Sequence, residues 1–218
     1  MDSEVLALLR NYLETDPSDL SAQVRVLGNL LVITWAIHTL DWAFRTGDLD
    51  GRENGNLGGF LGIHPREITG LPGVVCAHFL HGLERRKGLN DNSHIIGNSM
   101  VFAVLGLCLA LQGVRFFYVV SIAVLLSSGI GTWLFGRPGP HVGASGVLFG
   151  YMGFLMTYGF TSFNIGALLV GFLTLILYSR LVVGIFPQDE GTSWEMHLFG
   201  FLGGVFMALV LTSLRPSF

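Results

Sequence analysis

The sequence predicts an all-α integral membrane protein with six membrane-spanning helices. Of its 218 residues, 51% are hydrophobic and only 12% are charged, whereas a soluble domain of this size carries about 25% charged residues. Long apolar runs recur along the chain, and each approaches the ~20 residues that cross a bilayer. The 30 glycines are typical of helices that pack closely in lipid through small residues.

Residues 1–23 are expected to form an N-terminal segment outside the membrane core. The stretch is acidic and lacks the basic region with which a signal peptide begins. Its leucines, Leu6, Leu8, Leu9 and Leu13, predict a short amphipathic helix. Asp16-Pro17-Ser18 then ends that helix and offers a cap for the next one.

Residues 24–218 are predicted to form one membrane domain of six helices. The predicted spans are 24–44, 94–112, 116–134, 145–160, 165–186 and 194–214. The first span is the least uniform, because His38 and Asp41 lie near its far end, where Trp35 and Trp42 are placed as interfacial anchors. The connections after the second span are short, so the helices belong to one domain.

The connection 45–93 is long and divides into three parts. It opens with a stretch rich in Gly, Asp and Asn, over 47–56, that predicts an irregular loop. Ile68–Leu80 is apolar but too short to span, which indicates an interfacial or re-entrant segment. Residues 84–92 are polar and are expected to form a solvated excursion.

Composition argues against several classes of partner. The net charge of -3 does not favour nucleic acid. Cys76 and Cys108 lie in apolar surroundings and form neither a disulfide framework nor a metal-binding spacing, so no metal and no cofactor are expected. Half of the 12 Lys and Arg residues lie in the connection 45–93. The positive-inside rule would place this loop in the cytoplasm, but it weakens for long loops, so charge alone leaves the orientation open.

Polar residues open three of the predicted helices at one face of the membrane. The second, fourth and sixth spans enter from the same side, and their first turns carry His94 with Asn98, Ser145, and His197. All four side chains lie within about two helical turns of that face. Because polar groups in spanning helices usually face the bundle interior and mark function, their convergence predicts a functional site.

These residue types predict a hydrolytic site. Ser145 is the expected nucleophile, and His197 is expected to take its proton and return it to the leaving amine. No acid is placed to orient the imidazole, since Glu195 lies two residues away and should point elsewhere, which indicates a dyad. The Ser145 N–H at a helix N-terminus, the Asn98 amide and the His94 ring are expected to bind the oxyanion.

Glycines on the fourth and sixth helices are expected to bring the dyad together. Gly146 and Gly150 on the fourth helix, with Gly200 and Gly204 on the sixth, follow the spacing of small residues that lets backbones approach. Gly143, two residues before the serine, fits a sharply bent backbone at the helix entrance.

Each of these residues also has an ordinary explanation when taken singly. A lone serine in a membrane helix usually bonds a backbone carbonyl, and a lone histidine is evenly divided between packing and function. By default, the remaining histidines are assigned structural or solvent-facing roles: His38, His64, His78 and His141. Asp41 is expected to pair with a local donor, and it is the acid to examine first for a hidden role. Taken together, the four converging groups favour function.

Three motifs resemble the signatures of the rhomboid intramembrane serine proteases. They are Gly-Ala-Ser-Gly at 143–146, His-Ile-Ile-Gly-Asn at 94–98, and His-Leu-Phe-Gly-Phe-Leu-Gly-Gly at 197–204, which match GxSG, HxxxN and HxxGxxxG. The resemblance implies a bacterial-type six-helix bundle in the cell membrane, with a cytoplasmic N-terminus and an active site open to the outer face. It implies Ser145 and His197 as the dyad, His94 and Asn98 in the oxyanion hole, and single-spanning membrane proteins as substrates.

The sequence departs from this family in two places. Residues 84–92 are inserted between His81-Gly82 and His94, where the family usually has a few residues. Phe149 stands where tyrosine is frequent, and it can stack on His197 without offering a hydroxyl.

Two other classes remain as alternatives. A protease-like protein that binds membrane helices without cutting them usually loses the serine or the histidine, and this chain keeps both. A small transporter would be expected to have midplane charges or inverted repeats, and neither is seen in the sequence. No particular substrate, gating helix or oligomeric state is predicted.

Overall fold

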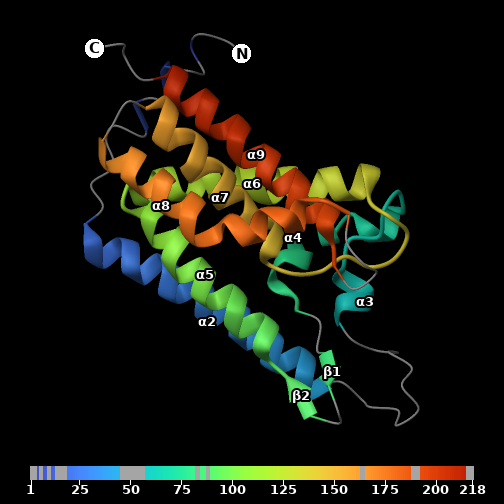
Figure 1. The fold of residues 1–218 in the computed structure, drawn as a ribbon. Coiled ribbons are helices and arrows are strands. Elements are labelled where there is room, and N and C mark those ends of the chain that lie inside the picture. The colour runs from blue at the N-terminus through green and yellow to red at the C-terminus, as the bar shows by residue number, and fades with distance from the viewer. Residues whose placement is uncertain are drawn as a thin grey trace.

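Long helices lie where the sequence predicts the membrane spans (Figure 1). The structure, a computed structural model, describes residues 19–44, 57–81, 84–86, 89–162, 165–187 and 192–214, with residues 4, 7, 8, 11 and 12. Within these ranges the long helices are α2 (Leu20–Phe44), α5 (Ser93–Ala110), α6 (Val114–Phe135), α7 (Ser145–Thr161), α8 (Ile165–Val182) and α9 (Trp194–Ser213). The all-helical membrane class is thereby supported, with bounds that differ from prediction by a few residues.

Four segments of the described chain are long and apolar enough to cross a membrane. They are Leu20–Ala43, Ser93–Ala110, Val114–Phe135 and Trp194–Ser213. The other two predicted spans are shorter: α7 has 17 residues, and the apolar part of α8 runs over Ile165–Leu177. At 1.5 Å per residue α7 is about 26 Å long, which is less than the ~30 Å hydrocarbon core of a bilayer. A bundle of six crossing helices therefore stays a prediction.

The N-terminal segment 1–23 lies for the most part outside the described residues. Its last residues belong to α2, which begins at Leu20. Asp19 caps this helix, because its carboxylate accepts hydrogen bonds from the Ala22 N–H and the Ser21 hydroxyl, both at 2.8 Å. The same bonds, that of Ala22 first, hold the pKa of Asp19 below its ordinary value.

The described part of the connection between α2 and α5 contains four short helical segments, each too short to span a membrane. They are α3 (Leu57–Leu61), η1 (Ile68–Gly70), α4 (Gly73–Cys76) and η2 (Ala77–Phe79). The Val74 backbone of α4 lies so close to Gly129 of α6 that a Cβ at position 129 would overlap it. The apolar stretch around α4 is therefore packed against the bundle.

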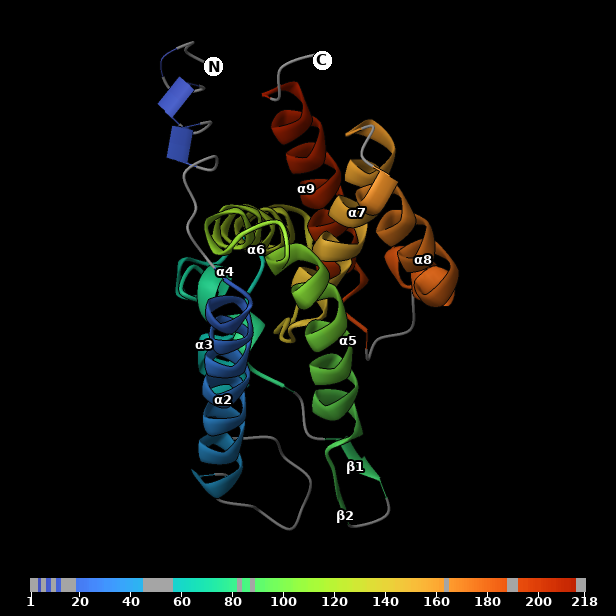
Figure 2. The same ribbon diagram turned by 90° about the vertical axis from the view of Figure 1, so that its left-hand side faces the viewer.

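The polar insertion contains a β-hairpin that the sequence did not predict. Strand β1 (Glu84–Arg86) pairs antiparallel with β2 (Leu89–Asp91), and β2 leads directly into α5. The two strands thus lie at the start of the helix that carries His94 and Asn98 (Figures 1 and 2).

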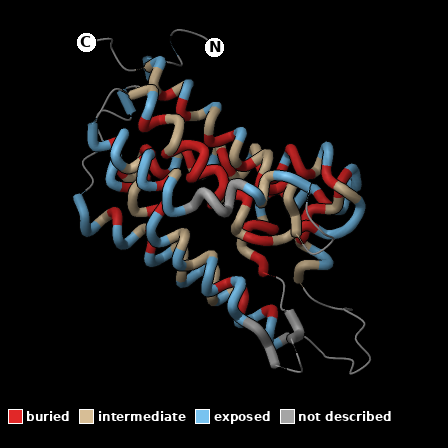
Figure 3. The backbone as a smooth tube through the Cα atoms, in the orientation of Figure 1, coloured by how far each residue is buried: buried red, intermediate tan, exposed pale blue. Residues whose placement is uncertain are grey.

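The core of the bundle lies around α7, with α6 and α9 beside it (Figure 3). Fully buried side chains include Phe117 and Val124 of α6 and Tyr151 and Phe154 of α7. By contrast, α2 lies at the edge of the bundle with α5 as its neighbour (Figure 2) and exposes large apolar side chains such as Val32. Apolar side chains facing outward are what a lipid environment favours.

Glycines hold α7 directly against α9. A Cβ on Gly200 would overlap the carbonyl oxygen of Gly146, and a Cβ on Gly204 would overlap that of Gly150. These are the four glycines that the sequence singles out for helix packing. A Cβ on Gly150 would also overlap the Val124 side chain of α6. The two helices can therefore approach only where both lack side chains.

Replacing Gly200 with alanine is expected to destabilise the protein. The added methyl group has no room beside Gly146, so the helices must separate, and overpacking of this kind costs about 1–3 kcal/mol or more. The free energy of unfolding, measured by titration with a denaturing detergent, should fall accordingly. Gly28→Ala is the matched control, since a Cβ at Gly28 of α2 meets nothing within 4 Å. Equal stability of Gly200→Ala and wild type would contradict the packing described.

Candidate active site

Ser145 is the first residue of α7, and a loop from α6 delivers it there. The loop, residues 136–144, turns at Gly143, whose φ of 128° is a backbone conformation that favours glycine. The Gly143 N–H donates to the carbonyl of Ala77 in η2 at 2.9 Å. Ala144 caps α7 without a side-chain hydrogen bond, and the first amides of a helix have no acceptor within the helix. Ser145 therefore lies beside N–H groups that can bind an anion.

His197 reaches Ser145 from the first turn of α9. Its Nε2 lies 2.7 Å from the Ser145 Oγ, and its Nδ1 lies 2.9 Å from the carbonyl oxygen of Gly184. Because a carbonyl can only accept, Nδ1 carries the proton, which leaves Nε2 free to accept from the serine hydroxyl. A backbone carbonyl thus orients the imidazole in the position where serine hydrolases often use an acid. Sequence reasoning missed Gly184, since a main-chain acceptor leaves no signal in residue type.

Phe149 packs against one face of the His197 imidazole. The two rings are stacked, with centroids 4.2 Å apart and an interplanar angle of 7°. Gly184 belongs to η3 (Val183–Ile185), and a Cβ on it would lie 2.8 Å from the Phe149 Cζ and 3.3 Å from the His197 Nδ1. The stack therefore requires a glycine at position 184, and together these groups leave the ring little freedom to rotate.

The dyad faces a cleft of about 680 Å³. His94 and Asn98 of α5 line the same cleft, so the residues that the sequence expects at one membrane face do share one site. The Asn98 Nδ2 is buried and has no hydrogen-bond partner within the described part of the chain, as expected for a donor that awaits a ligand. The His94 side chain is exposed at the helix entrance.

A row of histidine rings lies behind His94. The His81 ring is 5.8 Å from that of His94 and 6.2 Å from that of His38, and the His38 Nε2 lies 3.1 Å from the Asn92 Oδ1. Burial lowers the pKa of His81 to about 4, with smaller contributions from His94 and His38, so its ring is neutral at neutral pH. The row packs edge to face and supports the entrance of α5.

Other polar residues that the sequence analysis singled out have local partners. The Asp41 Oδ1 accepts from the Leu57 N–H at 2.6 Å, at the start of α3. The His64 Nε2 lies 2.9 Å from the Gly59 carbonyl, and the His141 Nε2 lies 2.9 Å from that of Arg137. In the described ranges no three His, Cys, Asp or Glu side chains are grouped to hold a metal ion.

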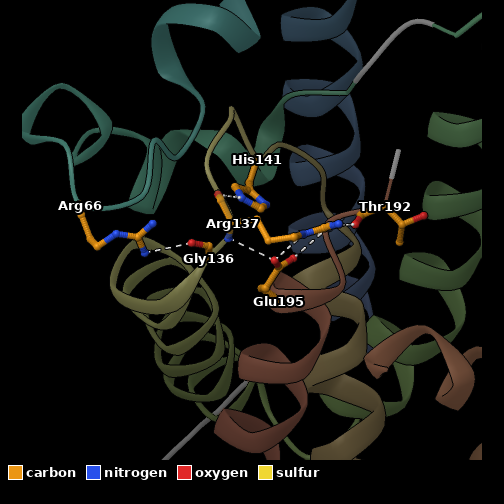
Figure 4. A network of polar contacts seen from close by, with 6 residues as sticks. All are labelled: Arg66, Gly136, Arg137, His141, Thr192 and Glu195. Atoms are coloured by element: carbon orange, nitrogen blue, oxygen red, sulfur yellow. Dashed lines mark hydrogen bonds and ion pairs between the residues drawn. The ribbon is translucent and has the colours of Figure 1, made fainter. Parts of the chain in front are cut away.

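Glu195 has a defined partner, Arg137, in the loop before Ser145 (Figure 4). It is only 1% exposed, and its Oε1 accepts from the Arg137 Nε at 2.7 Å and from the Arg137 N–H at 3.1 Å. The Arg137 Nη2 also donates to the Thr192 carbonyl at 2.7 Å. Sequence reasoning assigned no role to Arg137. The available signal was an acid in the first turn of an apolar helix, which needs a cation if it is buried.

Comparison with known proteins identifies a domain over much of the chain. The family model for the rhomboid domain matches residues 90–214, which include all four residues of the candidate site. An uncharacterized protein of Mycobacterium tuberculosis is 32% identical over 161 residues, covering 70% of this chain and 64% of that protein. One of Mycobacterium leprae is 33% identical over 161 residues, covering 70% of this chain and 61% of its own length.

A plant protein is also similar. RHOMBOID-like protein 1 of Arabidopsis thaliana is 33% identical over 133 residues, which are 57% of this chain and 32% of the plant protein. The chain thus spans less than two thirds of the length of these curated relatives.

Replacing Phe149 with leucine is expected to slow the reaction of Ser145 with a fluorophosphonate. A stacked aromatic pair contributes about 0.5–1.5 kcal/mol, so the labelling rate should fall about two- to tenfold as the His197 ring gains freedom. Phe154→Leu is the control on the same helix, because Phe154 stacks on Tyr158, 5.1 Å away, and not on the imidazole. It should lower stability and leave the rate unchanged; equal slowing by both variants would contradict the role of the stack.

Proposed function

The chain belongs to the rhomboid family of membrane proteins, and from that premise we propose that it is a serine protease acting within the membrane. The observation that carries the proposal is the 2.7 Å contact between the Ser145 Oγ and the His197 Nε2. Each residue stands in the first turn of an apolar helix, and both face one cleft. A hydroxyl in hydrogen-bond contact with an oriented imidazole is the arrangement that activates a serine for attack.

In the proposed reaction, His197 takes the Ser145 proton as the Oγ attacks the carbonyl carbon of the scissile peptide bond. The oxyanion that forms accepts hydrogen bonds from the Ser145 N–H, the Asn98 amide and the His94 ring. His197 then gives its proton to the leaving amine, and an acyl-enzyme remains on Ser145. A water molecule that loses its proton to His197 attacks the ester, and the proton returns to Ser145.

The site is proposed to lie below the membrane surface. The short α7 begins with Ser145, and α5, α7 and α9 enter the bundle from one end. The cleft of about 680 Å³ has room for water, which hydrolysis requires and which irregular backbone at membrane depth needs. From the resemblance to the rhomboid family we propose single-spanning membrane proteins as substrates, cut inside or beside the bilayer. The proposed topology has six spans, a cytoplasmic N-terminus and the cleft facing the outer side of the cell membrane.

A helix-binding protein without catalysis is the second candidate in this family. Such a protein would need the cleft between helices but no activated serine. The contact of His197 with both Ser145 and the Gly184 carbonyl favours the enzyme, because simple helix binding gives no reason to fix an imidazole in one tautomer.

The proposal is tested by labelling the purified protein with a fluorophosphonate probe. Wild type should be labelled, Ser145→Ala should not be labelled, and His197→Ala should react at least about a hundredfold more slowly, because the hydroxyl loses its base. Thermal unfolding in detergent checks that each variant is folded. Equal labelling of wild type and Ser145→Ala would contradict the assignment and leave the helix-binding function.

A further inference from the structure

The Arg137–Glu195 pair connects the two segments that carry the dyad. Arg137 lies in the loop before Ser145, and Glu195 lies in the first turn of α9, two residues before His197. The partners are 58 residues apart in sequence. Figure 4 shows the guanidinium extending from the loop to the carboxylate at the entrance of the helix.

The pair is held at both ends by several hydrogen bonds. The Glu195 carboxylate receives the Nε and the main-chain N–H of Arg137, at 2.7 and 3.1 Å. The Nη2 of the same arginine donates to the Thr192 carbonyl at 2.7 Å and approaches the Glu195 Oε2 at 3.4 Å. Both the backbone and the side chain of Arg137 are therefore fixed relative to the start of α9.

Other contacts fix the same loop to a different part of the protein. The Arg66 Nη1 donates to the Gly136 carbonyl at 2.9 Å and to the Leu134 carbonyl at 3.2 Å. His141 exchanges two main-chain hydrogen bonds of 3.0 Å with Ile63. These contacts hold the loop to the segment between α2 and α5, whereas Arg137 holds it to α9.

We propose that Arg137 and Glu195 are positioning residues of the dyad, which fix the first turn of α9 so that His197 faces Ser145. Successive helix residues turn by about 100°, so residues two apart point about 200° from each other. Glu195 therefore faces the loop while His197 faces the serine. This inference rests on the proposed protease function and adds to it the element that sets the rotation of the helix carrying the base.

In the first turn of α9, Met196 lies beside Gly146 of α7, and its carbonyl accepts a hydrogen bond from the Ser128 Oγ of α6 at 3.0 Å. The ion pair adds to these contacts a bond from the loop before Ser145. Gly200 and Gly204 lie in the second and third turns of α9, where they set the distance to α7. The first turn lacks the full set of intrahelical hydrogen bonds and frays more easily. Burial of a carboxylate destabilises the protein unless a cation lies close to it in good geometry. Glu195 therefore favours the rotation of α9 about its axis in which the carboxylate contacts Arg137.

The test replaces the pair without leaving a buried charge. In the double variant Arg137→Gln/Glu195→Gln both charges are removed together, which is far less damaging than the removal of one. We expect its rate of fluorophosphonate labelling and its kcat for a membrane-spanning substrate in proteoliposomes to fall about tenfold. The KM should stay within about twofold, since the substrate cleft is unchanged. Arg137→Lys keeps the positive charge but loses the planar guanidinium with its several donors, so it should be labelled at an intermediate rate. This variant tests the inference if the double variant does not fold.

Arg66→Gln is the matched control. It removes an arginine whose side chain bonds the end of α6 and the start of the same loop, and within the described part of the chain neither of these two bonds goes to α9. Its labelling rate should therefore stay within about twofold of wild type. If the folded double variant or Arg137→Lys is labelled at the wild-type rate, the positioning role is overturned and the protease function stands. The same holds if Arg66→Gln is slowed as much as the double variant. An unlabelled wild type would overturn the protease function and the inference with it.

Discussion

Glycine backbones in direct contact hold α7 against α9, and the geometry of the site depends on that contact. Gly146 meets Gly200 and Gly150 meets Gly204, at separations that no side chain could occupy. Lipid supplies no hydrophobic driving force between helices, so close packing of this kind must provide the stability. It also sets the geometry of the site, because Ser145 and His197 lie in the first turns of these two helices. If α7 and α9 moved slightly apart, the hydrogen bond between Ser145 and His197 would be lost.

The His197 imidazole is oriented by a backbone carbonyl and not by an acidic side chain. His197 is held on three sides, by the Ser145 hydroxyl, the Gly184 carbonyl and the Phe149 ring. None of these three contacts brings a charge into the cleft, and a neutral group costs less to bury than a charged one. The acid that does lie nearby, Glu195, is buried and is paired with Arg137 of the loop before Ser145.

Residue periodicity and helix parity predicted a large part of this arrangement. Apolar runs located the long helices, and the alternation of their direction placed His94, Asn98, Ser145 and His197 at one cleft, as observed. The Gly184 carbonyl could not be predicted, because any residue has a carbonyl and only the path of η3 places this one. Likewise, nothing in the spacing of Arg137 and Glu195 relates them, since their contact depends on the loop being folded over α9. The hairpin β1–β2 was missed because its strands are short and polar, without the alternation that marks a buried strand.

The structure of the protein after reaction with a fluorophosphonate would test the central claim most directly. The account predicts phosphorus bonded to the Ser145 Oγ, with the His197 Nδ1 still bonded to the Gly184 carbonyl. The phosphoryl oxygen should lie within hydrogen-bond distance of the Ser145 N–H and the Asn98 Nδ2, as donors to an oxyanion require. Phosphorus on another residue, or a phosphoryl oxygen directed away from α5, would contradict it.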